Sequence, residues 1–95
     1  GTIVKSEIFE QARNPAYKLW IDFGEYGYKK SSAQITTLYD VKELIGKQVL
    51  AVLNFPPKQI ASFMSECLVL GAVDSKLGVS LISPDHKVIN GARIA

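Results

Sequence analysis

The residues with the clearest binding chemistry lie in one segment, residues 52–72, where two apolar strand-like runs flank a long polar stretch. The Pro-Pro pair at 56–57 must end the first run, because proline cannot donate the hydrogen bonds of a β-ladder. Asn54 precedes the prolines, Lys58 follows them and Ser65 closes the segment. Amide, ammonium and hydroxyl groups can bind phosphates and base edges, so these three side chains are candidates for a binding role. Each also has a structural alternative, as a strand cap, a solvated lysine and a turn former respectively.

Four side chains of the same segment are too apolar for open water: Phe55, Ile60, Phe63 and Met64. Aromatic rings can stack on a base, and the four together can line a pocket for an apolar peptide. For Phe55 and Phe63 the alternative is a local hydrophobic anchor that closes the loop. Trp20 raises a similar question, because it shares a predicted strand face with polar residues. It could serve as a stacking platform, as a dimer contact, or as a half-buried side chain beneath a loop.

A second group of candidates lies on a predicted strand, residues 28–35. Ser31, Ser32 and Gln34 have small or polar side chains that allow a ligand to approach the sheet closely, and Lys30 beside them supplies positive charge. The alternative is that the two serines are small residues that pack beneath a neighbouring loop.

The sequence gives little support for catalysis or metal binding. His86 is the only histidine, so one chain cannot assemble a multi-histidine zinc site. Cys67 begins an apolar strand without a basic sequence neighbour to lower its pKa, which predicts a buried packing thiol. Neither a catalytic triad nor a glycine-rich phosphate loop is evident. We therefore predict a binding protein without enzyme activity, cofactor or metal.

The composition indicates one globular domain, residues 1–95, of which 47% are hydrophobic. The net charge is only +2, but the sequence between residues 26 and 65 contains five lysines and only two acidic residues. The longest apolar runs, 49–53 and 67–73, are far shorter than the roughly 20 residues of a membrane helix, so no membrane insertion is expected. A single cysteine and no secretion signal predict a reducing, cytoplasmic location. Because the chain opens on Gly1 inside a predicted strand, without an initiator Met, we expect that an N-terminal extension is missing.

The order of the predicted elements indicates the fold class. Strand patterns cover residues 2–8, 17–23, 28–35, 47–55, 65–72 and 78–83, and a short helix pattern covers residues 40–46. A brief helix between the third and fourth of five strands predicts an all-β fold, the five-stranded Greek-key OB barrel, followed by a short C-terminal extension. A β-sandwich is the alternative, but it does not require that helix. OB barrels bind oligonucleotides with two loops, which correspond here to residues 7–16, containing Arg13, and residues 54–65.

Two of these segments carry sharper local signals. In 17–23 the apolar side chains alternate strictly, which predicts one buried and one polar strand face. In 40–46, Asp40 and Glu43 stand at the spacing of a helix capping box, and Gly46 ends the helix.

Several motifs along the chain resemble a known family. They are "GTIV", "ARNPAYKLWIDFG", "SSAQI", "LIGKQVLAVLNFPP", "SECLVLG" and "NGARI". These motifs resemble the tRNA-binding OB-domain family, which also occurs as an appendage of methionyl-tRNA synthetases, and above all its CsaA type, known as an export-related chaperone. Two features depart from the wider family, which has His-Pro where this chain has Arg13-Asn14, and Ser-Glu-Gly-Met where this chain has "SEC" and then Leu68.

The resemblance implies a function in tRNA binding, in which positive charges position the RNA backbone and the protein reads folded shape more than sequence. The residues it implies as tRNA contacts are Arg13, Lys18, Lys30, Ser31, Ser32, Gln34, Asn54, Lys58 and Ser65. The alternative is a chaperone that binds unfolded secretory precursor proteins through Phe55, Ile60, Phe63 and Met64 on the same surface. Free members of the family are typically homodimers, so the resemblance also implies a two-fold pair.

Overall fold

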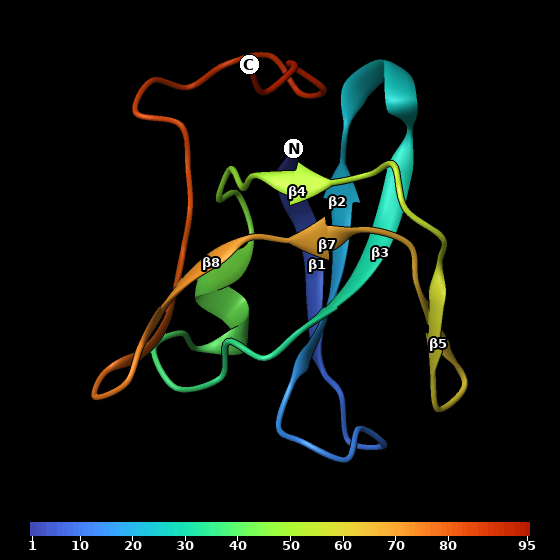
Figure 1. Ribbon diagram of the computed structural model, residues 1–95, viewed down its shortest axis with the longest axis vertical. Coiled ribbons are helices and arrows are strands. Elements are labelled where there is room, and N and C mark those ends of the chain that lie inside the picture. The colour runs from blue at the N-terminus through green and yellow to red at the C-terminus, as the bar shows by residue number, and fades with distance from the viewer.

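The first half of the chain forms a three-stranded antiparallel sheet in the computed structural model, which describes residues 1–95 (Figure 1). The strands are β1 (Thr2–Ile8), β2 (Tyr17–Asp22) and β3 (Tyr28–Ala33), in the order β1-β2-β3. The alternation predicted for residues 17–23 is confirmed, because its apolar side chains are buried and the intervening ones are half-buried. In β1 the register shifts between Ile3 and Lys5. This β-bulge explains why the sequence of the first strand shows no clean alternation.

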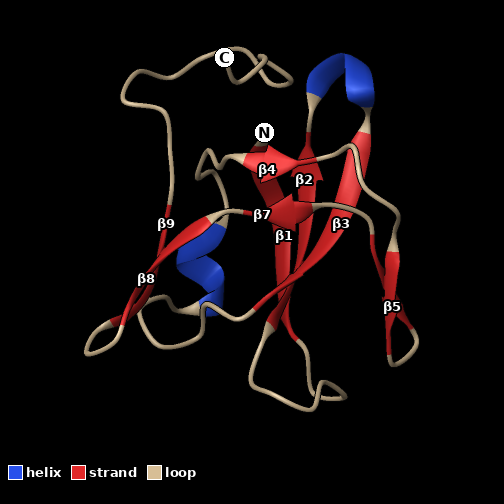
Figure 2. Cartoon of the chain, viewed as in Figure 1, coloured by secondary structure: helices blue, strands red, loops and turns tan.

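The helical content is limited to two short 3-10 turns, shown in blue in Figure 2. They are η1 (Gly24–Tyr26), between β2 and β3, and η2 (Val41–Leu44), where the helix at 40–46 was predicted. The Glu43 carboxylate accepts the backbone N–H of Asp40 at 2.8 Å, which is the contact expected from the capping-box spacing. Gly46 follows the helix with a φ of +93°, a conformation that favours glycine. The prediction of an all-β chain with one small helical insertion is therefore confirmed in outline.

The second half of the chain has shorter strands than the sequence predicted. They are β4 (Ala51–Val52), β5 (Lys58–Ile60), β6 (Phe63–Ser65), β7 (Leu68–Val69), β8 (Gly71–Asp74) and β9 (Gly78–Leu81), which pair as β4-β7, β5-β6 and β8-β9. The prediction of one continuous strand over residues 47–55 and another over 65–72 was therefore wrong. The reason lies in the backbone hydrogen bonds: the Leu50 N–H donates to Ile82, that of Ile82 to Leu70, and that of Leu70 to Leu50. Three segments thus share their hydrogen bonds at one junction, and no long ladder forms there.

The segment predicted as an open loop, residues 54–65, is a β-hairpin made of β5 and β6. Lys58 pairs with Ser65 and Ile60 with Phe63, and Ala61 at the turn has a φ of +54°. The pattern gave no hairpin signal because no Asn-Gly or Asp-Gly pair marks the turn. In Figure 1 this hairpin stands at the opposite side of the molecule from β8.

Backbone hydrogen bonds tie the small sheets to one another. The Ile3 N–H donates to the Lys47 carbonyl at 2.9 Å, and the Val49 N–H donates to the Gly1 carbonyl at 2.8 Å. These bonds hold the segment before β4 against β1, and β4 in turn pairs with β7. The space between is filled by a ten-residue core. Its members are Ile3, Tyr17, Leu19, Ile21, Phe23, Ala33, Ile35, Leu44, Val49 and Cys67.

The C-terminal residues 82–95 contain turns but no strand. Asn90 anchors them to the sheet, because its Oδ1 accepts the Thr2 hydroxyl at 2.7 Å. Gln48 adds a second anchor, with its amide oxygen accepting the Val88 N–H at 3.1 Å. No helix in the structure has the length and apolar character needed to cross a membrane.

Candidate functional site

A small apolar cluster lies on the face of the β1-β2-β3 sheet that points away from the core. Its buried members are Phe9, Ala16 and Phe63, with Trp20 packed against them. The Phe63 ring meets Phe9 edge-on at a centroid distance of 5.4 Å and Trp20 at 5.8 Å. Such edge-to-face pairs stabilise by about 0.5–1.5 kcal/mol beyond simple burial. Phe63 therefore fastens the β5-β6 hairpin to the sheet and to the loop after β1.

Three lysines cover this cluster. Lys18 Nζ lies 5.0 Å from the Phe9 ring centroid and 5.5 Å from that of Phe63. Lys30 Nζ lies 5.2 Å from the Phe63 centroid, and Lys5 Nζ lies 4.5 Å from the Trp20 ring. We call these six residues the aromatic–lysine platform: Lys5, Phe9, Lys18, Trp20, Lys30 and Phe63.

The strand register explains the platform, because Trp20 is paired with both Lys5 and Lys30 across the sheet. Directly opposed residues share a sheet face, so the three side chains are held in one row. Lys5 makes an ion pair with Glu7 at 3.3 Å, whereas Lys18 and Lys30 lie within ion-pair distance of no carboxylate. Two ammonium groups are thus held on aromatic rings with their charge free for an anion.

The edge of β3 is joined to residues 65–67 by backbone and side-chain hydrogen bonds rather than by a regular strand ladder. The Lys30 N–H donates to Glu66 Oε1 at 2.9 Å, and the Glu66 N–H donates to the Lys30 carbonyl at 2.7 Å. Two residues further along β3, the Ser32 N–H donates to Ser65 Oγ at 3.1 Å. We call this contact the β3 seam. It fixes the backbone from which Lys30 reaches the platform.

Two predicted binding serines belong to the seam. Ser31 is 1% exposed and its hydroxyl donates to the Cys67 carbonyl at 2.9 Å, and Ser65 is 6% exposed. Both hydroxyls are enclosed by the protein and hold β3 against the end of the hairpin. The structure thus gives Ser31 the packing role that was the alternative interpretation, and it gives Ser65 a seam contact rather than a position on the surface.

Cys67 is 1% exposed, as expected of a packing thiol. Burial, the largest cause, raises the pKa of its thiol from a usual value of 9.0 to about 11, and the Ser31 hydroxyl opposes that change. A thiol of this pKa stays protonated at neutral pH and is a poor nucleophile.

Four of the predicted binding residues meet in one shallow cavity of about 280 Å³ beside the platform. Arg13 comes from the loop between β1 and β2, Ser32 from β3, Gln34 from just beyond β3 and Lys58 from β5. No acidic side chain lines this cavity. We call it the Arg13–Lys58 cavity. It adjoins the platform, because Ala16 and Ile60 line the cavity and also pack in the aromatic cluster.

The remaining predicted residues are more scattered. Asn54 is exposed before the hairpin and does not line the Arg13–Lys58 cavity. Among the four apolar candidates, Phe63 is 6% exposed and Met64 is 40% exposed, and Phe55 and Ile60 are half-buried. The burial of Phe63 is what its interpretation as a local anchor expects. Trp20 is half-buried in the same cluster, which matches the interpretation of half-burial beneath a loop.

The sequence interpretation missed three residues of the site. Phe9 lies in the loop after β1, where one aromatic residue in a polar stretch was the available signal. Lys5 was hidden by the bulge in β1, which breaks the alternation that would place it on the Trp20 face. Glu66 carried no signal, because its contact joins residues that lie 36 positions apart.

Comparison with known proteins places the chain in a family. Residues 1–93 match the family described as "Putative tRNA binding domain". Methionine–tRNA ligase of Methanococcoides burtonii is 30% identical over 94 residues, which is 99% of this chain and 14% of that protein. The chain therefore spans only a small part of the curated relatives it matches.

Two solved structures are similar over almost the whole chain. The chaperone CsaA of Bacillus anthracis has a TM-score of 0.94 and 52% identity, covering 100% of this chain and 86% of that one. The CsaA chaperone protein of Picrophilus torridus has a TM-score of 0.92 and 54% identity, covering 99% and 86%. With its family match over nearly every residue and these close structural relatives, the chain belongs to the tRNA-binding domain family.

Proposed function

We propose that this domain binds tRNA without catalysing a reaction, through the Arg13–Lys58 cavity and the adjoining platform. The observation that carries the proposal is the convergence of Arg13, Lys58 and the polar Ser32–Gln34 edge from three separate segments onto one cavity without an acidic lining residue. A guanidinium group can grip a phosphate with two parallel hydrogen bonds, and a lysine adds a mobile point charge.

The platform supplies further positive charge rather than a stacking surface. Phe63 is buried beneath Lys18 and Lys30, so a base cannot lie on its ring. The two ammonium groups instead present charge beside the cavity, at a spacing fixed by the rings and the β3 seam. Backbone contacts of this kind position an RNA and respond to its shape more than to its sequence.

We infer that the strands complete an OB barrel. Hydrogen bonds join β1 to residues 47–49, β4 pairs with β7, and the β3 seam joins residues 65–67 to β3. This order leads around the ten-residue core and back to the β1-β2-β3 sheet. It brings the loop between β1 and β2 and the β5-β6 hairpin to one side, where OB folds bind oligonucleotides.

A second candidate function is the binding of unfolded secretory precursor proteins. Two observations favour it: the solved structures that are 52% and 54% identical are both named CsaA chaperones, and the Met64 side chain is 40% exposed on the hairpin. Exposed methionine is adaptable and suits apolar partners of varied shape. The same hairpin would then serve both ligands.

We also propose a homodimer. Trp20 no longer argues for one, because it packs within its own chain. Val73 and Leu77, which are 81% and 63% exposed on the β8-β9 hairpin, provide apolar surface for a partner copy. Sedimentation at micromolar concentration should show a species of twice the chain mass, and a single-chain mass alone would refute the dimer.

One titration separates the two functions. Fluorescent tRNA is titrated with the protein at two salt concentrations, and each titration is repeated with an unfolded secretory precursor as competitor. If tRNA is the ligand, affinity should fall steeply with salt, because phosphate contacts release counterions. Weak tRNA binding that does not depend on salt, together with tight precursor binding, would favour the chaperone function.

A further inference from the structure

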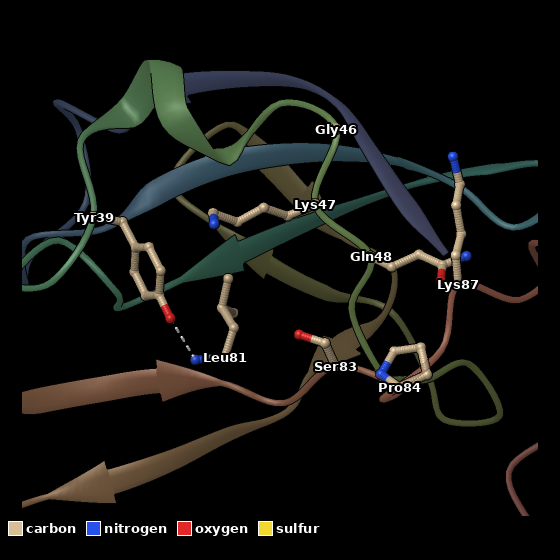
Figure 3. A pocket seen from close by; sticks show the side chains of 8 residues that line it. All are labelled: Tyr39, Gly46, Lys47, Gln48, Leu81, Ser83, Pro84 and Lys87. Atoms are coloured by element: carbon tan, nitrogen blue, oxygen red, sulfur yellow. Dashed lines mark hydrogen bonds between the residues drawn. The ribbon is translucent and has the colours of Figure 1, made fainter.

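A second polar cavity has a volume of about 320 Å³. Figure 3 shows its lining side chains, and Figure 1 shows that the chain segments which carry them lie on the opposite side of the molecule from the β5-β6 hairpin. It is formed by two chain segments that take no part in the platform or in the Arg13–Lys58 cavity: residues 39–48, around η2, and residues 81–87, after β9. Only two of its eight lining residues are hydrophobic, and none is acidic. A cavity of this volume is at the small end of the range for ligand sites, which is roughly 300–1,000 Å³.

The hydroxyl of Tyr39 is a fixed donor at one wall. Its oxygen accepts the backbone N–H of Leu81 at 2.8 Å, so its own hydrogen is left for another acceptor. The Tyr39 carbonyl is held as well, because it accepts the Tyr17 hydroxyl at 2.7 Å. Tyr39 is therefore held at its backbone carbonyl and at its phenol oxygen, while the phenol proton has no acceptor within the protein.

Positive charge lies beside this hydroxyl. Lys47 Nζ lies 5.8 Å from the centroid of the Tyr39 ring, and it makes no ion pair. In Figure 3 the Lys47 ammonium and the Ser83 hydroxyl are turned toward the space beside Tyr39, whereas Lys87 extends away at the far rim. Ser83 Oγ has no hydrogen-bond partner within the chain. The cavity thus brings together hydroxyl donors and positive charge without an acidic side chain.

The wall that carries Ser83 is held in place by Gln48. Both polar atoms of the Gln48 side chain bind the backbone of Val88, and its nitrogen also reaches Asn90 Oδ1 at 3.3 Å. These contacts fasten the segment after β9 to the segment that precedes β4. The backbone of this wall and the Tyr39 phenol are therefore held in place before a ligand arrives, which reduces the ordering cost of binding.

We propose that this cavity binds a phosphate group. A phosphate has acceptor oxygens on several sides, which match a lysine ammonium, a phenol and a serine hydroxyl that approach from different walls. The phosphate can belong to a small phosphorylated molecule or to an RNA backbone. In both cases the cavity would recognise the same group, a tetrahedral phosphate with negatively charged oxygens.

The test is a titration with inorganic phosphate, and separately with dimethyl phosphate, followed by the backbone amide signals of the ¹⁵N-labelled protein. Sodium chloride replaces phosphate at constant ionic strength as the control. The Leu81 amide should move in a saturable way, because it is bonded to the Tyr39 oxygen. Lys47→Met should weaken binding about two- to fivefold, since the exposed lysine loses its charge contact with the phosphate while the aliphatic stem remains. Tyr39→Phe should weaken binding as well.

The matched control is Lys76→Met, which removes an exposed lysine in the β8-β9 turn and should leave phosphate binding unchanged. Binding of dimethyl phosphate as well as inorganic phosphate would identify a backbone phosphate as the source, and binding of inorganic phosphate alone would identify a phosphate monoester or free phosphate. Shifts that follow ionic strength alone, or an equal loss in Lys47→Met and Lys76→Met, would overturn the proposal. These outcomes do not depend on tRNA binding, because neither probe is an RNA.

Discussion

The two faces of the β1-β2-β3 sheet carry apolar clusters of different kinds. The inner face contributes to a ten-residue core from which charged side chains are absent, whereas the outer cluster has three buried members and three lysines lying over its rings. The inner cluster is built from regular alternation, as in β2. The outer cluster consists of residues that do not follow this alternation. They are Phe9 in a loop, Trp20 on the polar face of β2 and Phe63 in a hairpin. The comparison suggests that the inner cluster determines the fold and the outer one positions the site.

The largest expected effect is on the inner face. Leu19 is 0% exposed at the centre of β2, so Leu19→Ala should lower the free energy of unfolding by about 3–5 kcal/mol. Urea denaturation followed by circular dichroism measures this change. At a temperature where the variant is still folded, its affinity for tRNA should stay within about twofold of that of the parent. A strongly reduced affinity in the folded variant would show that the two faces are not independent.

On the outer face we expect a smaller loss of stability and a larger loss of affinity for tRNA. Phe63→Ala removes the ring that joins the hairpin to Phe9 and Trp20 and that lies under two lysines. We expect a smaller loss of stability, about 2–3 kcal/mol, because the cluster is small and its lysine stems can collapse into the space. Affinity for tRNA should fall about tenfold, because Lys18 and Lys30 lose their support. Fluorescence titration at low salt measures it, and Phe63→Leu, which keeps an apolar anchor, should recover most of the stability but not all of the affinity.

The fold was predictable where one face of an element is buried. The alternation in β2, the capping residues of η2 and the mostly β character are local patterns, and the structure contains them. The lengths of the later strands were not predictable, because Leu50, Leu70 and Ile82 share hydrogen bonds at a three-segment junction. Apolar runs indicate burial, but they do not show which backbone group meets which.

The candidate site was predictable in its residue types and less so in its assembly. Arg13, Ser32, Gln34 and Lys58 were chosen singly, and the structure brings them to one cavity. The β3 seam was not predictable, since Glu66 and Ser65 act through backbone groups of residues more than thirty positions earlier. Sequence spacing carries no information about such contacts. For the same reason Ser31 could be identified as small and polar but not as buried.

A smaller effect should come from Cys67, which lies where the core meets the β3 seam. Burial raises the pKa of its thiol to about 11, so the folded protein keeps the proton while the unfolded chain loses it above its usual value of 9.0. The unfolded state then binds fewer protons, and stability should fall as the pH rises between about 9 and 11. We expect a loss of about 1 kcal/mol by about pH 10. The same series on Cys67→Ala should be flatter, and parallel curves for the two proteins would contradict this origin.

The smallest expected effect concerns one charge on the outer face. Lys58 lies on β5 and lines the Arg13–Lys58 cavity with its side chain exposed. Lys58→Glu removes one phosphate contact and adds a repulsive charge, so affinity for tRNA should fall about two- to fivefold, given the roughly 0.2–1 kcal/mol of an exposed ion pair. The slope of log affinity against log salt should shrink by about 0.7–0.9, alike for all tRNA sequences.

Two comparisons make this result specific to the cavity. Lys76→Glu makes the same change of charge in the β8-β9 turn, so it should change the slope much less if the contact is local. Asn54→Ala removes an uncharged side chain and should leave the slope as it is, whatever it does to affinity. Equal changes in Lys58→Glu and Lys76→Glu would show that only the net charge of the domain matters. An unchanged slope in Lys58→Glu, together with loss of precursor binding in a polar variant of Met64, would assign the hairpin to unfolded peptides, since apolar contacts release no counterions.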